Sequence, residues 1–374
     1  MGYYTNAQQA ALYYSRKRRR DLLNAVSPSI AETLFPLGEE GILLDPSQLD
    51  TLYQSVNAEA APVATDGDSV GIAMDVRTWA GKTFAQIMDS QPELWDHSNV
   101  TLTGEAEIVG ENSYRLLSTG AFSSIDVGNV MAAGELYRVT FDLTSQVSGS
   151  MQFGNVGAVS FIEKSTVSIN GVSTASCFFK RVAACDIFFE NVSVKKIPGN
   201  HMVQATALDR PVYKTAGGKH WLEADGVNHW MQAAFTLPQP WNRYTGLHII
   251  TFNSGDNIYY GVGGSKGTLQ MSAPSPNVSM YNTAYMASVS ALIGADIAWW
   301  EKFDGAASEH QINDNTLLVG STGATDATQG WTLFASNTGS VPANVRFYGG
   351  IMRSEFTAAE RAIAKEWITD RITP

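Results

Sequence analysis

The stretches LYRVTFDL at residues 136–143 and DIFFENVSVKKI at residues 186–197 decide the fold of this chain. In both, apolar and polar residues alternate, which is the pattern of a β-strand with one buried face. Shorter segments of the same kind, separated by Gly, Ser and Asn, predict strands at 100–102, 114–117, 150–153, 165–169 and 177–180. Strands of this length and spacing are typical of an antiparallel β-sandwich or jelly roll.

Strand patterns also dominate the rest of the chain. A short apolar strand is expected at 70–74, and a second strand-rich block runs from about residue 200 to residue 352. Its clearest members are LHIITFN (247–253), IYYGVGG (258–264), TLLVGS (316–321), WTLFAS (331–336) and VRFYGGIM (345–352). No period of about 20 to 50 residues recurs, which argues against a solenoid.

Two helices are expected, one near each end of the chain. Residues 5–26 have apolar positions near helical spacing and end at Ser27-Pro28. Residues 357–371 begin with a capping box, Thr357 with Glu360, and place apolar residues on one face. We therefore predict a mainly β protein with an N-terminal helical segment and a C-terminal helix.

The composition excludes several classes of protein. Of the 374 residues, 44% are hydrophobic and only 16% are charged, so neither disorder nor a coiled coil is expected. The formal charge of −11 has the same sign as the phosphate backbones of nucleic acids, which argues against a nucleic-acid partner. Because there is no run of about 18 apolar residues and no secretory signal, we expect no membrane insertion and synthesis in a cytoplasm without export.

The first 35 residues differ in charge from the rest of the chain. Their two acidic residues are outnumbered by five bases: Arg16, Lys17, Arg18, Arg19 and Arg20. Four aromatic residues lie near these bases: Tyr3, Tyr4, Tyr13 and Tyr14. The two main interpretations are a solvated face on a terminal helix and a segment that docks into a larger assembly. Binding to nucleic acid is the weakest of the alternatives.

Several phrases of the sequence resemble a known family. The segments LDPSQLDTLYQ (44–54) with APVATDGDSVGIAMD (61–75), and GNHMVQATALDRPVY (199–213) with HWLEADGVNHWM (220–231), resemble the two separated halves of one domain. That domain is the concanavalin A-like (laminin G-like) domain of bacteriophage and prophage virion proteins. The closing segment YGGIMRSEFTAAERAIAKEWITDR (348–371) is similar to the end of the same domain. The intervening residues, which end in DIFFENVSVKKIPGN, are similar to carbohydrate-binding jelly-roll modules.

The resemblance implies two antiparallel β-sandwich modules, one inserted in the other. The discontinuous concanavalin A-like module would comprise residues 36–80 and 199–374, and the inserted jelly roll residues 81–198. Residues 1–35 do not align with either module and would anchor the protein to a virion.

The resemblance also implies a function. It points to a phage structural protein, such as a tail fibre, head fibre, spike or decoration protein, that binds host-surface polysaccharide without cleaving it. A homo-oligomer, most plausibly a trimer, is typical of such proteins. Two alternatives stay open: a purely architectural virion protein without a glycan ligand, and a polysaccharide depolymerase.

Catalytic and metal sites are weakly indicated. Some concanavalin A-like glycosidases use a Glu-x-Asp-x-x-Glu strand, but here Glu223 and Asp225 are followed by Asn228, whose amide cannot act as a general acid. No cofactor is expected. Ca²⁺ is conceivable at four loop carboxylates, although turn formation explains them better: Asp66, Asp68, Asp225 and Asp256. The two cysteines, Cys177 and Cys185, are expected to be half-buried thiols.

Exposed aromatic side chains are the candidates for glycan binding, since their faces pack on the C–H face of a pyranose. In the middle of the chain the candidates are Trp95 and Tyr114, and in the later block they are Trp230, Trp241, Trp299, Trp300 and Trp331. For any single one, packing in a core is the stronger expectation. Because Trp299 and Trp300 are adjacent, strand alternation must turn one of them away from the core.

Overall fold

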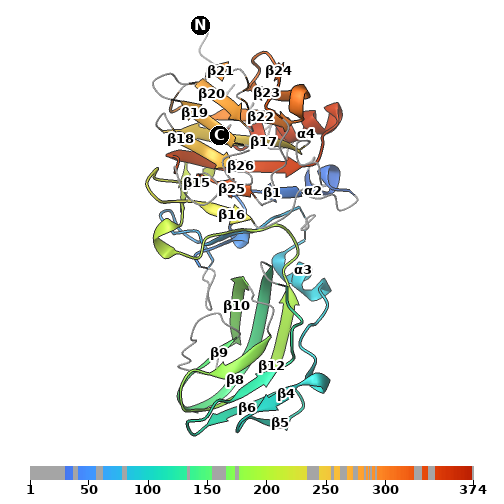
Figure 1. Ribbon diagram of the computed structural model, residues 1–374, viewed down its shortest axis with the longest axis vertical. Helices are drawn as coiled ribbons and strands as arrows, with labels where there is room; N and C mark the ends of the chain where they lie inside the picture. Colours follow the sequence, from blue (N-terminus) through green and yellow to red (C-terminus); the bar gives the residue numbers. More distant parts are fainter. Residues whose placement is uncertain are drawn as a thin grey trace, which may run out of the picture.

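The computed structural model (Figure 1) describes most of the chain after residue 29. The described residues are 30–36, 41–55, 62–77, 82–132, 135–153, 166–172, 177–233, 244–253, 257–261, 268–272, 277–281, 284, 286, 289–290, 293–323, 331–335 and 342–372. The predicted N-terminal helix at 5–26 and its basic and aromatic residues lie outside these ranges.

Two large sheets are formed by strands from both ends of the sequence, which we call the larger unit. The eight-stranded sheet has the order β14 (Val212–Ala216), β15 (Lys219–Glu223), β26 (Val345–Arg353), β17 (Tyr244–Phe252), β22 (Ile297–Phe303), β23 (Ser308–Ile312) and β24 (Leu318–Gly320), with β1 (Gly41–Leu44) also paired to β26. The nine-stranded sheet has the order β2 (Leu52–Tyr53), β3 (Ile72–Ala73), β13 (Met202–Val203), β16 (Met231–Ala233), β25 (Trp331–Leu333), β18 (Asn257–Gly261), β19 (Thr268–Ser272), β20 (Asn277–Tyr281) and β21 (Val289–Ser290).

The strands between residues 101 and 196 form two separate sheets, which we call the inserted unit. One has five strands in the order β10 (Thr166–Val172), β8 (Leu136–Ser148), β12 (Cys185–Lys196), β6 (Ser113–Ser118) and β5 (Glu107–Gly110). The other has four strands in the order β4 (Thr101–Thr103), β7 (Ser124–Asp126), β11 (Phe178–Arg181) and β9 (Met151–Phe153). No strand of this unit pairs with a described strand of the larger unit.

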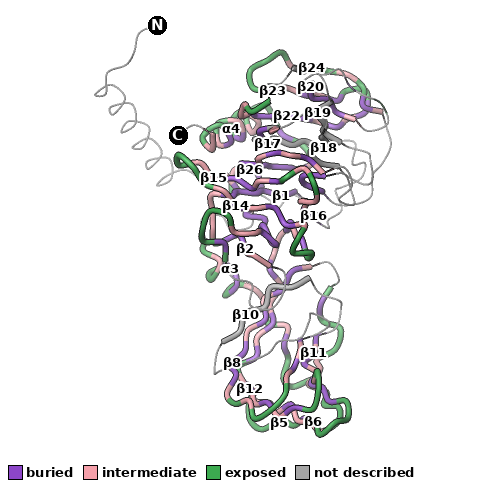
Figure 2. The backbone as a smooth tube through the Cα atoms, turned by 90° about the vertical axis from the view of Figure 1, so that its left-hand side faces the viewer, coloured by how far each residue is buried: buried purple, intermediate pink, exposed green. Residues whose placement is uncertain are grey.

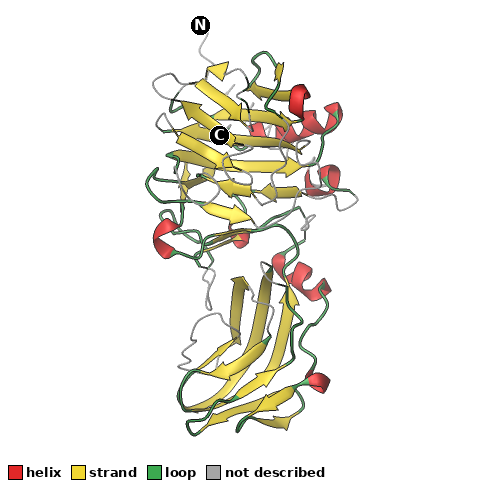
Figure 3. Cartoon of the chain, viewed as in Figure 1, coloured by secondary structure: helices red, strands yellow, loops and turns green. Residues whose placement is uncertain are grey.

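Helices are few among the described residues (Figure 3). They are α2 (Ile30–Leu34), α3 (Phe84–Ser90) and α4 (Ala358–Thr369), with short 3-10 turns at Leu49–Thr51, His97–Asn99, Ala207–Asp209 and Gly305–Ala307. The predicted capping box of Thr357 and Glu360 begins α4. The predicted mainly β fold of antiparallel sheets with a C-terminal helix is therefore confirmed.

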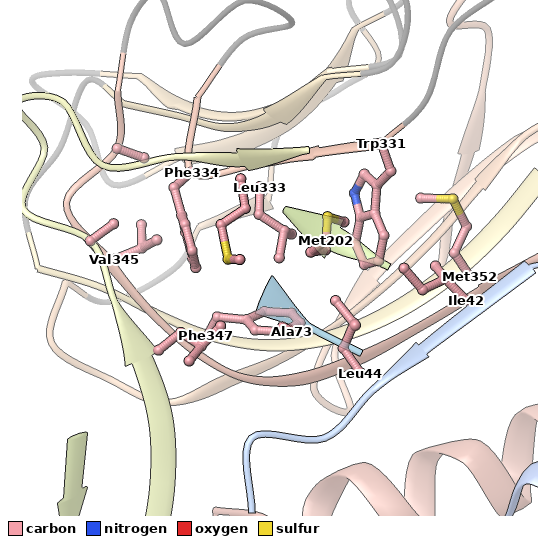
Figure 4. Packing of buried hydrophobic residues seen from close by; sticks show 14 of the residues in the cluster. Ile42, Leu44, Ala73, Met202, Trp331, Leu333, Phe334, Val345, Phe347 and Met352 are labelled. Carbon is pink, nitrogen blue, oxygen red and sulfur yellow. The ribbon is translucent and has the colours of Figure 1, made fainter. Parts of the chain in front are cut away.

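The core of the larger unit lies between its two sheets. Trp299, Phe347 and Met352 of the eight-stranded sheet pack with Trp331 and Leu333 of the nine-stranded sheet, and all five are buried. Figure 4 shows that residues from both ends of the sequence meet in this core, including Ile42 and Ala73 together with Met202 and Val345. Residues far apart in sequence thus share one core.

The core of the inserted unit is aromatic. Phe179 lies at its centre, with ring centroids 5.4 Å from Trp95, 5.2 Å from Phe141, 5.0 Å from Phe153 and 4.7 Å from Phe189. Most of these pairs are edge-to-face, which is the favoured geometry for buried rings. The two sheets of the unit are therefore held together by a cluster of interlocking aromatic side chains.

The chain leaves the larger unit just after Asp75 and returns to it just before His201. The buried carboxylate of Asp75 fixes both crossing points. Its Oδ1 accepts hydrogen bonds from the backbone N–H of Leu43 (3.0 Å) and of Arg77 (3.0 Å), while Oδ2 accepts from the backbone N–H of Asn200 (2.9 Å) and from Arg77 Nε (2.7 Å). One side chain thus ties β1, the outgoing segment and the returning segment together.

His201 completes this junction. Its Nδ1 accepts the backbone N–H of Asp75 (3.1 Å), so the ring proton lies on Nε2, which donates to the carbonyl of Ile197 (3.1 Å). Burial lowers the pKa of His201 to about 4, because the charged imidazolium would lose its hydration there. Around the polar groups, Ile87 and Met88 of α3 belong to one apolar cluster with Leu136 and Ile197.

We predict that acid weakens the fold through His201. Its folded pKa of about 4 lies below the unfolded value of 6.5, so the unfolded chain takes up the proton first. The stabilising contribution of His201 is full above pH 6.5 and is lost as the pH falls towards 4. Urea unfolding should show a loss of about 2 kcal/mol between pH 7 and pH 5.

The control is the variant His201→Gln, which cannot titrate and should show a flatter profile in the same pH range. Burial raises the pKa of Asp75, so the folded protein takes up this proton before the unfolded chain does, and acid stabilises the fold through Asp75. This effect is present in both the unmodified protein and His201→Gln. Equal slopes in the two proteins would contradict the assignment to His201.

Candidate functional site

The two aromatic candidates in the inserted unit are core residues. Trp95 and Tyr114 are both buried, and Trp95 Nε1 donates a hydrogen bond to the Tyr114 hydroxyl (3.0 Å). Alternation along β6 turns Tyr114 inward, where its ring lies 5.6 Å from that of Phe189. Both residues follow the stronger expectation of core packing, and the structure excludes them as glycan-binding candidates, since neither ring face is open to solvent.

Three tryptophans of the larger unit are also buried. Trp299 and Trp331 lie between the sheets, whereas Trp300 points to the opposite face of β22, as the alternation argument predicts. Trp300 is nevertheless only 5% exposed, because Arg361 of α4 stacks 4.1 Å from its ring centroid and Phe356 packs beside it. All three therefore follow the stronger expectation of core packing and are excluded as glycan-binding candidates. Sequence alternation gives the direction of Trp300 but not what covers it.

Trp230 is the one described tryptophan among the candidates that is half-buried rather than buried. Its backbone N–H donates to the carbonyl of Asp209 (2.9 Å), and its own carbonyl accepts from Gln204 Nε2 (3.0 Å). It lies in a loop whose neighbours Leu208 and Val227 are exposed. Trp241 lies outside the described residues.

The carboxylates considered for catalysis and Ca²⁺ have structural partners. Asp225 Oδ1 accepts the backbone N–H groups of Val227 (2.9 Å) and Asn228 (3.2 Å), which is a turn-forming role. Glu223 accepts from Trp221 Nε1 (2.9 Å). Asp68 likewise accepts backbone N–H groups of its own loop. The described residues contain no group of three or more His, Cys, Asp or Glu side chains able to hold a metal ion, and Asp256 is not among them.

Cys177 and Cys185 are free thiols and are buried more completely than predicted. Burial raises the pKa of Cys177 to about 12, so it stays protonated at neutral pH and is a poor nucleophile. None of the described helices has the length and apolar character needed to cross a membrane.

A different aromatic residue faces outward from the five-stranded sheet. In β12, Phe189 enters the core, so its neighbour Phe188 points to the outer face and is half-buried. Arg115 of β6 is the register partner of Phe188, and its guanidinium carbon lies 5.0 Å from the ring centroid. This is a cation–π contact on a surface open to solvent.

Arg115 is held rigidly in this position. Its Nε donates to Asp186 Oδ1 (2.8 Å) and its Nη2 to Asp186 Oδ2 (3.0 Å), a bidentate pair, while Glu107 Oε2 lies 3.6 Å from Nη1. The guanidinium lowers the pKa of Asp186, and the carboxylate raises the pKa of Arg115, so both stay charged. Their side chains keep 27% and 19% exposure, respectively, so ligand atoms can reach them.

The strands beneath these residues are bent. The pairing of β12 with β8 shifts register three times between Asp186 and Ser193, and Asn191 has a positive φ of 54°. Bulges of this kind bend a sheet and redirect side chains, and they are frequent beside binding sites. Next to the irregular stretch, Glu190 Oε2 accepts a hydrogen bond from the Ser113 hydroxyl (3.0 Å).

We call the set Phe188, Arg115, Asp186, Glu107, Glu190 and Ser113 the Phe188 platform. The other end of the same sheet face, nearest the larger unit, is covered by α3. There the Arg138 guanidinium lies 5.4 Å from the ring centroid of Phe84, and Lys195 Nζ donates to the carbonyl of Met88 (3.1 Å). In Figure 1, α3 lies beside the end of the five-stranded sheet that is nearest the larger unit.

The platform offers an aromatic ring bordered by fixed donors and acceptors. Such a surface suits a polyhydroxylated ligand, whose C–H groups pack on the ring while its hydroxyls bond to guanidinium and carboxylate. None of these residues was singled out from the sequence. The signal was present in the pair Phe188-Phe189, because two adjacent aromatics in an alternating strand cannot both be buried on one face.

Comparisons with known proteins assign no family. No family model and no curated protein matches this chain. Among solved structures, a Trypanosoma rangeli sialidase bound to the inhibitor DANA is similar at 8% identity and a TM-score of 0.30, over 54% of this chain and 42% of that one. This chain thus spans less than half of that sialidase.

Two further structures show similarity of the same grade. A tandem of two CBM22 modules from Paenibacillus barcinonensis is 9% identical, with a TM-score of 0.26 over 71% of this chain and 98% of that one. A truncated protein with CBM32 and alginate lyase domains is 8% identical, with a TM-score of 0.27 over 71% of this chain and all of that one. Similarities at this level carry no information about function.

We predict that the two adjacent phenylalanines differ sharply in their effect on stability. Phe189→Ala opens a cavity among buried rings and should lower the free energy of unfolding by about 3 to 5 kcal/mol. Phe188→Ala removes a half-exposed ring and should cost on the order of 1 kcal/mol or less. Urea unfolding of the two variants measures the difference. Equal losses would mean that Phe188 is a core residue and is not available to a ligand.

Proposed function

We propose that this protein binds carbohydrate through the Phe188 platform. The observation that carries the proposal is an outward aromatic ring held beside a bidentate Arg115–Asp186 pair on a sheet face that α3 leaves uncovered. A preorganised guanidinium and carboxylate can bond to sugar hydroxyls without first losing side-chain freedom. The half-buried ring supplies apolar contact without needing to be extracted from a core.

The charges of the platform favour one class of glycan. Its charged members are three carboxylates (Glu107, Asp186 and Glu190) and one guanidinium (Arg115). The guanidinium is already engaged by Asp186, so an incoming carboxylate or sulfate would meet net negative charge. Neutral sugars carry no such penalty. We therefore propose a neutral polysaccharide rather than one built from uronic or sialic acids.

At a finer level, we propose that the chain is a structural protein of a bacteriophage virion that binds host-surface polysaccharide without cleaving it. The resemblance of residues 44–75 and 199–231 to phage virion proteins supports this assignment. In this proposal residues 1–35 attach the protein to the particle and the inserted unit projects toward the host. A homotrimer would multiply weak single-site binding by presenting several platforms to one polymer.

The first test of the proposal uses binding to bacterial surface polysaccharide. The protein should co-sediment with host cells but not with cells stripped of polysaccharide, and the size of soluble polymer should not change during incubation. Phe188→Ala and Arg115→Gln should each weaken binding by about tenfold or more, because each removes a central contact of the site.

The matched control is Phe178→Ala. Phe178 is also half-buried and also has a cation near its ring, Lys180 at 5.3 Å, but it lies on the four-stranded sheet at the opposite face of the unit. Binding should survive this change. Loss of binding in Phe178→Ala but not in Phe188→Ala would show that the binding site lies on the four-stranded sheet. A decrease in polymer size would show that the protein is an enzyme.

A second test addresses the charge of the glycan. At low salt, neutral polymers should bind more tightly than matched polymers that contain uronic acid, and added salt should narrow the difference by screening the repulsion. Glu190→Gln removes one carboxylate and should further reduce the difference in affinity between neutral and acidic polymers. A preference for acidic polymers that disappears as salt is added would contradict the proposed ligand class.

A further inference from the structure

Three loops meet at the end of the inserted unit that lies farthest from the larger unit. They are residues 119–122 after β6, 147–150 at the end of β8, and 182–184 before β12. Since β12 runs from this end to the junction near His201, the loops lie at the distal tip of the unit, the end at which Figure 2 shows many exposed residues. We call these residues the distal tip.

The distal tip is an ordered surface whose loops are bonded to one another. The backbone N–H of Val182 donates to the carbonyl of Ser150 (3.0 Å), and that of Arg181 donates to the carbonyl of Ser123 (3.1 Å). Gly149 has a φ of +72°, and a side chain there would clash with the carbonyl oxygen of Ala184. The close approach of these loops therefore requires glycine at this position.

The exposed large side chains of the tip are apolar. Phe122, Val147 and Val182 are 53%, 67% and 44% exposed, and the alanines of these loops are exposed beside them: Ala121, Ala183 and Ala184. None of the eleven residues of the tip carries a charge itself, and charged groups stand at the border of the tip: Arg181 precedes Val182, and Glu105 accepts hydrogen bonds from the backbone N–H (2.5 Å) and the hydroxyl (2.8 Å) of Thr119. Several exposed apolar side chains on neighbouring loops indicate a surface that becomes covered.

The size and shape of the tip indicate what covers it. A stable protein interface buries roughly 800 Å² on each partner, far more than three large side chains at loop ends provide. Protruding apolar loop ends can instead enter the boundary layer of a lipid bilayer, where each side chain contributes separately and no complementary partner surface is needed.

We propose that the distal tip inserts shallowly into a lipid surface. The occupant is the acyl boundary of a bilayer with neutral headgroups, because the acidic protein would be repelled by anionic lipid. The Phe188 platform is continuous with the tip through Ser145 of β8, the register partner of Phe188, two residues before Val147. A sugar bound at the platform would therefore lie near the membrane plane. The sequence predicts no membrane insertion, and this proposal departs from that prediction.

The test places a fluorescent reporter at the tip. Val147→Cys, labelled with an environment-sensitive dye, is mixed with phosphatidylcholine vesicles, with and without bromine on the acyl chains. The two native thiols are buried and should not react. We expect increased emission on adding vesicles and quenching by the brominated lipid. The matched control is Val319→Cys, which is 65% exposed on the larger unit and should not respond.

A loss variant completes the test. Phe122→Ser with Val182→Ser should weaken co-sedimentation with the vesicles by about tenfold or more while leaving binding of soluble polysaccharide unchanged. A silent reporter at position 147, or dimerisation that depends on the tip in the absence of lipid, would overturn the inference. Because polysaccharide binding is measured separately, failure of the tip and failure of the Phe188 platform give different results.

Discussion

The buried carboxylate of Asp75 is the constraint on which the arrangement of this chain depends. It bonds to backbone N–H groups from three segments: Leu43 in β1, Arg77 on the way out and Asn200 on the way back. A buried carboxylate is costly unless its acceptor sites are filled, so these segments must come together for any of them to be stable. His201 closes the same cluster as a neutral donor and acceptor. Asp75 thus fixes the points at which the chain leaves the larger unit and returns to it.

Helices decide which parts of the outer sheet faces are open to a ligand. On the eight-stranded sheet, α4 covers Trp300 through Arg361 and turns a candidate binding residue into a packed one. On the five-stranded sheet, α3 covers only the end beside the junction, where Phe84 meets Arg138. The remaining part of that face carries Phe188 and its charged neighbours. The proposed site is thus the part of this sheet face that α3 does not cover.

Local patterns in the sequence were enough to predict the strands but not the site. The alternation of 136–143 and 186–197 predicts β8 and β12, because a strand with one buried face needs that period. The exposure of Trp95 or Trp300 depends instead on residues distant in sequence, so composition and turn signals cannot supply it. Phe188 was predictable in principle from its neighbour Phe189. The distal tip was not, because Phe122, Val147 and Val182 are brought together only by the connections of the finished sheets.

The pairing of β1 with β26 has a consequence for synthesis of the protein. Gly41 at the start of the described sheet pairs with Arg353, so the larger unit cannot complete its eight-stranded sheet until nearly the whole chain has left the ribosome. All described strands of the inserted unit lie between residues 101 and 196, and their pairings close within that stretch. Nascent chains fold as segments become complete, so the inserted unit is ready first. In the first segment of the larger unit, β2 can pair with β3 at once, whereas β1 has to wait for β26 while the inserted unit folds.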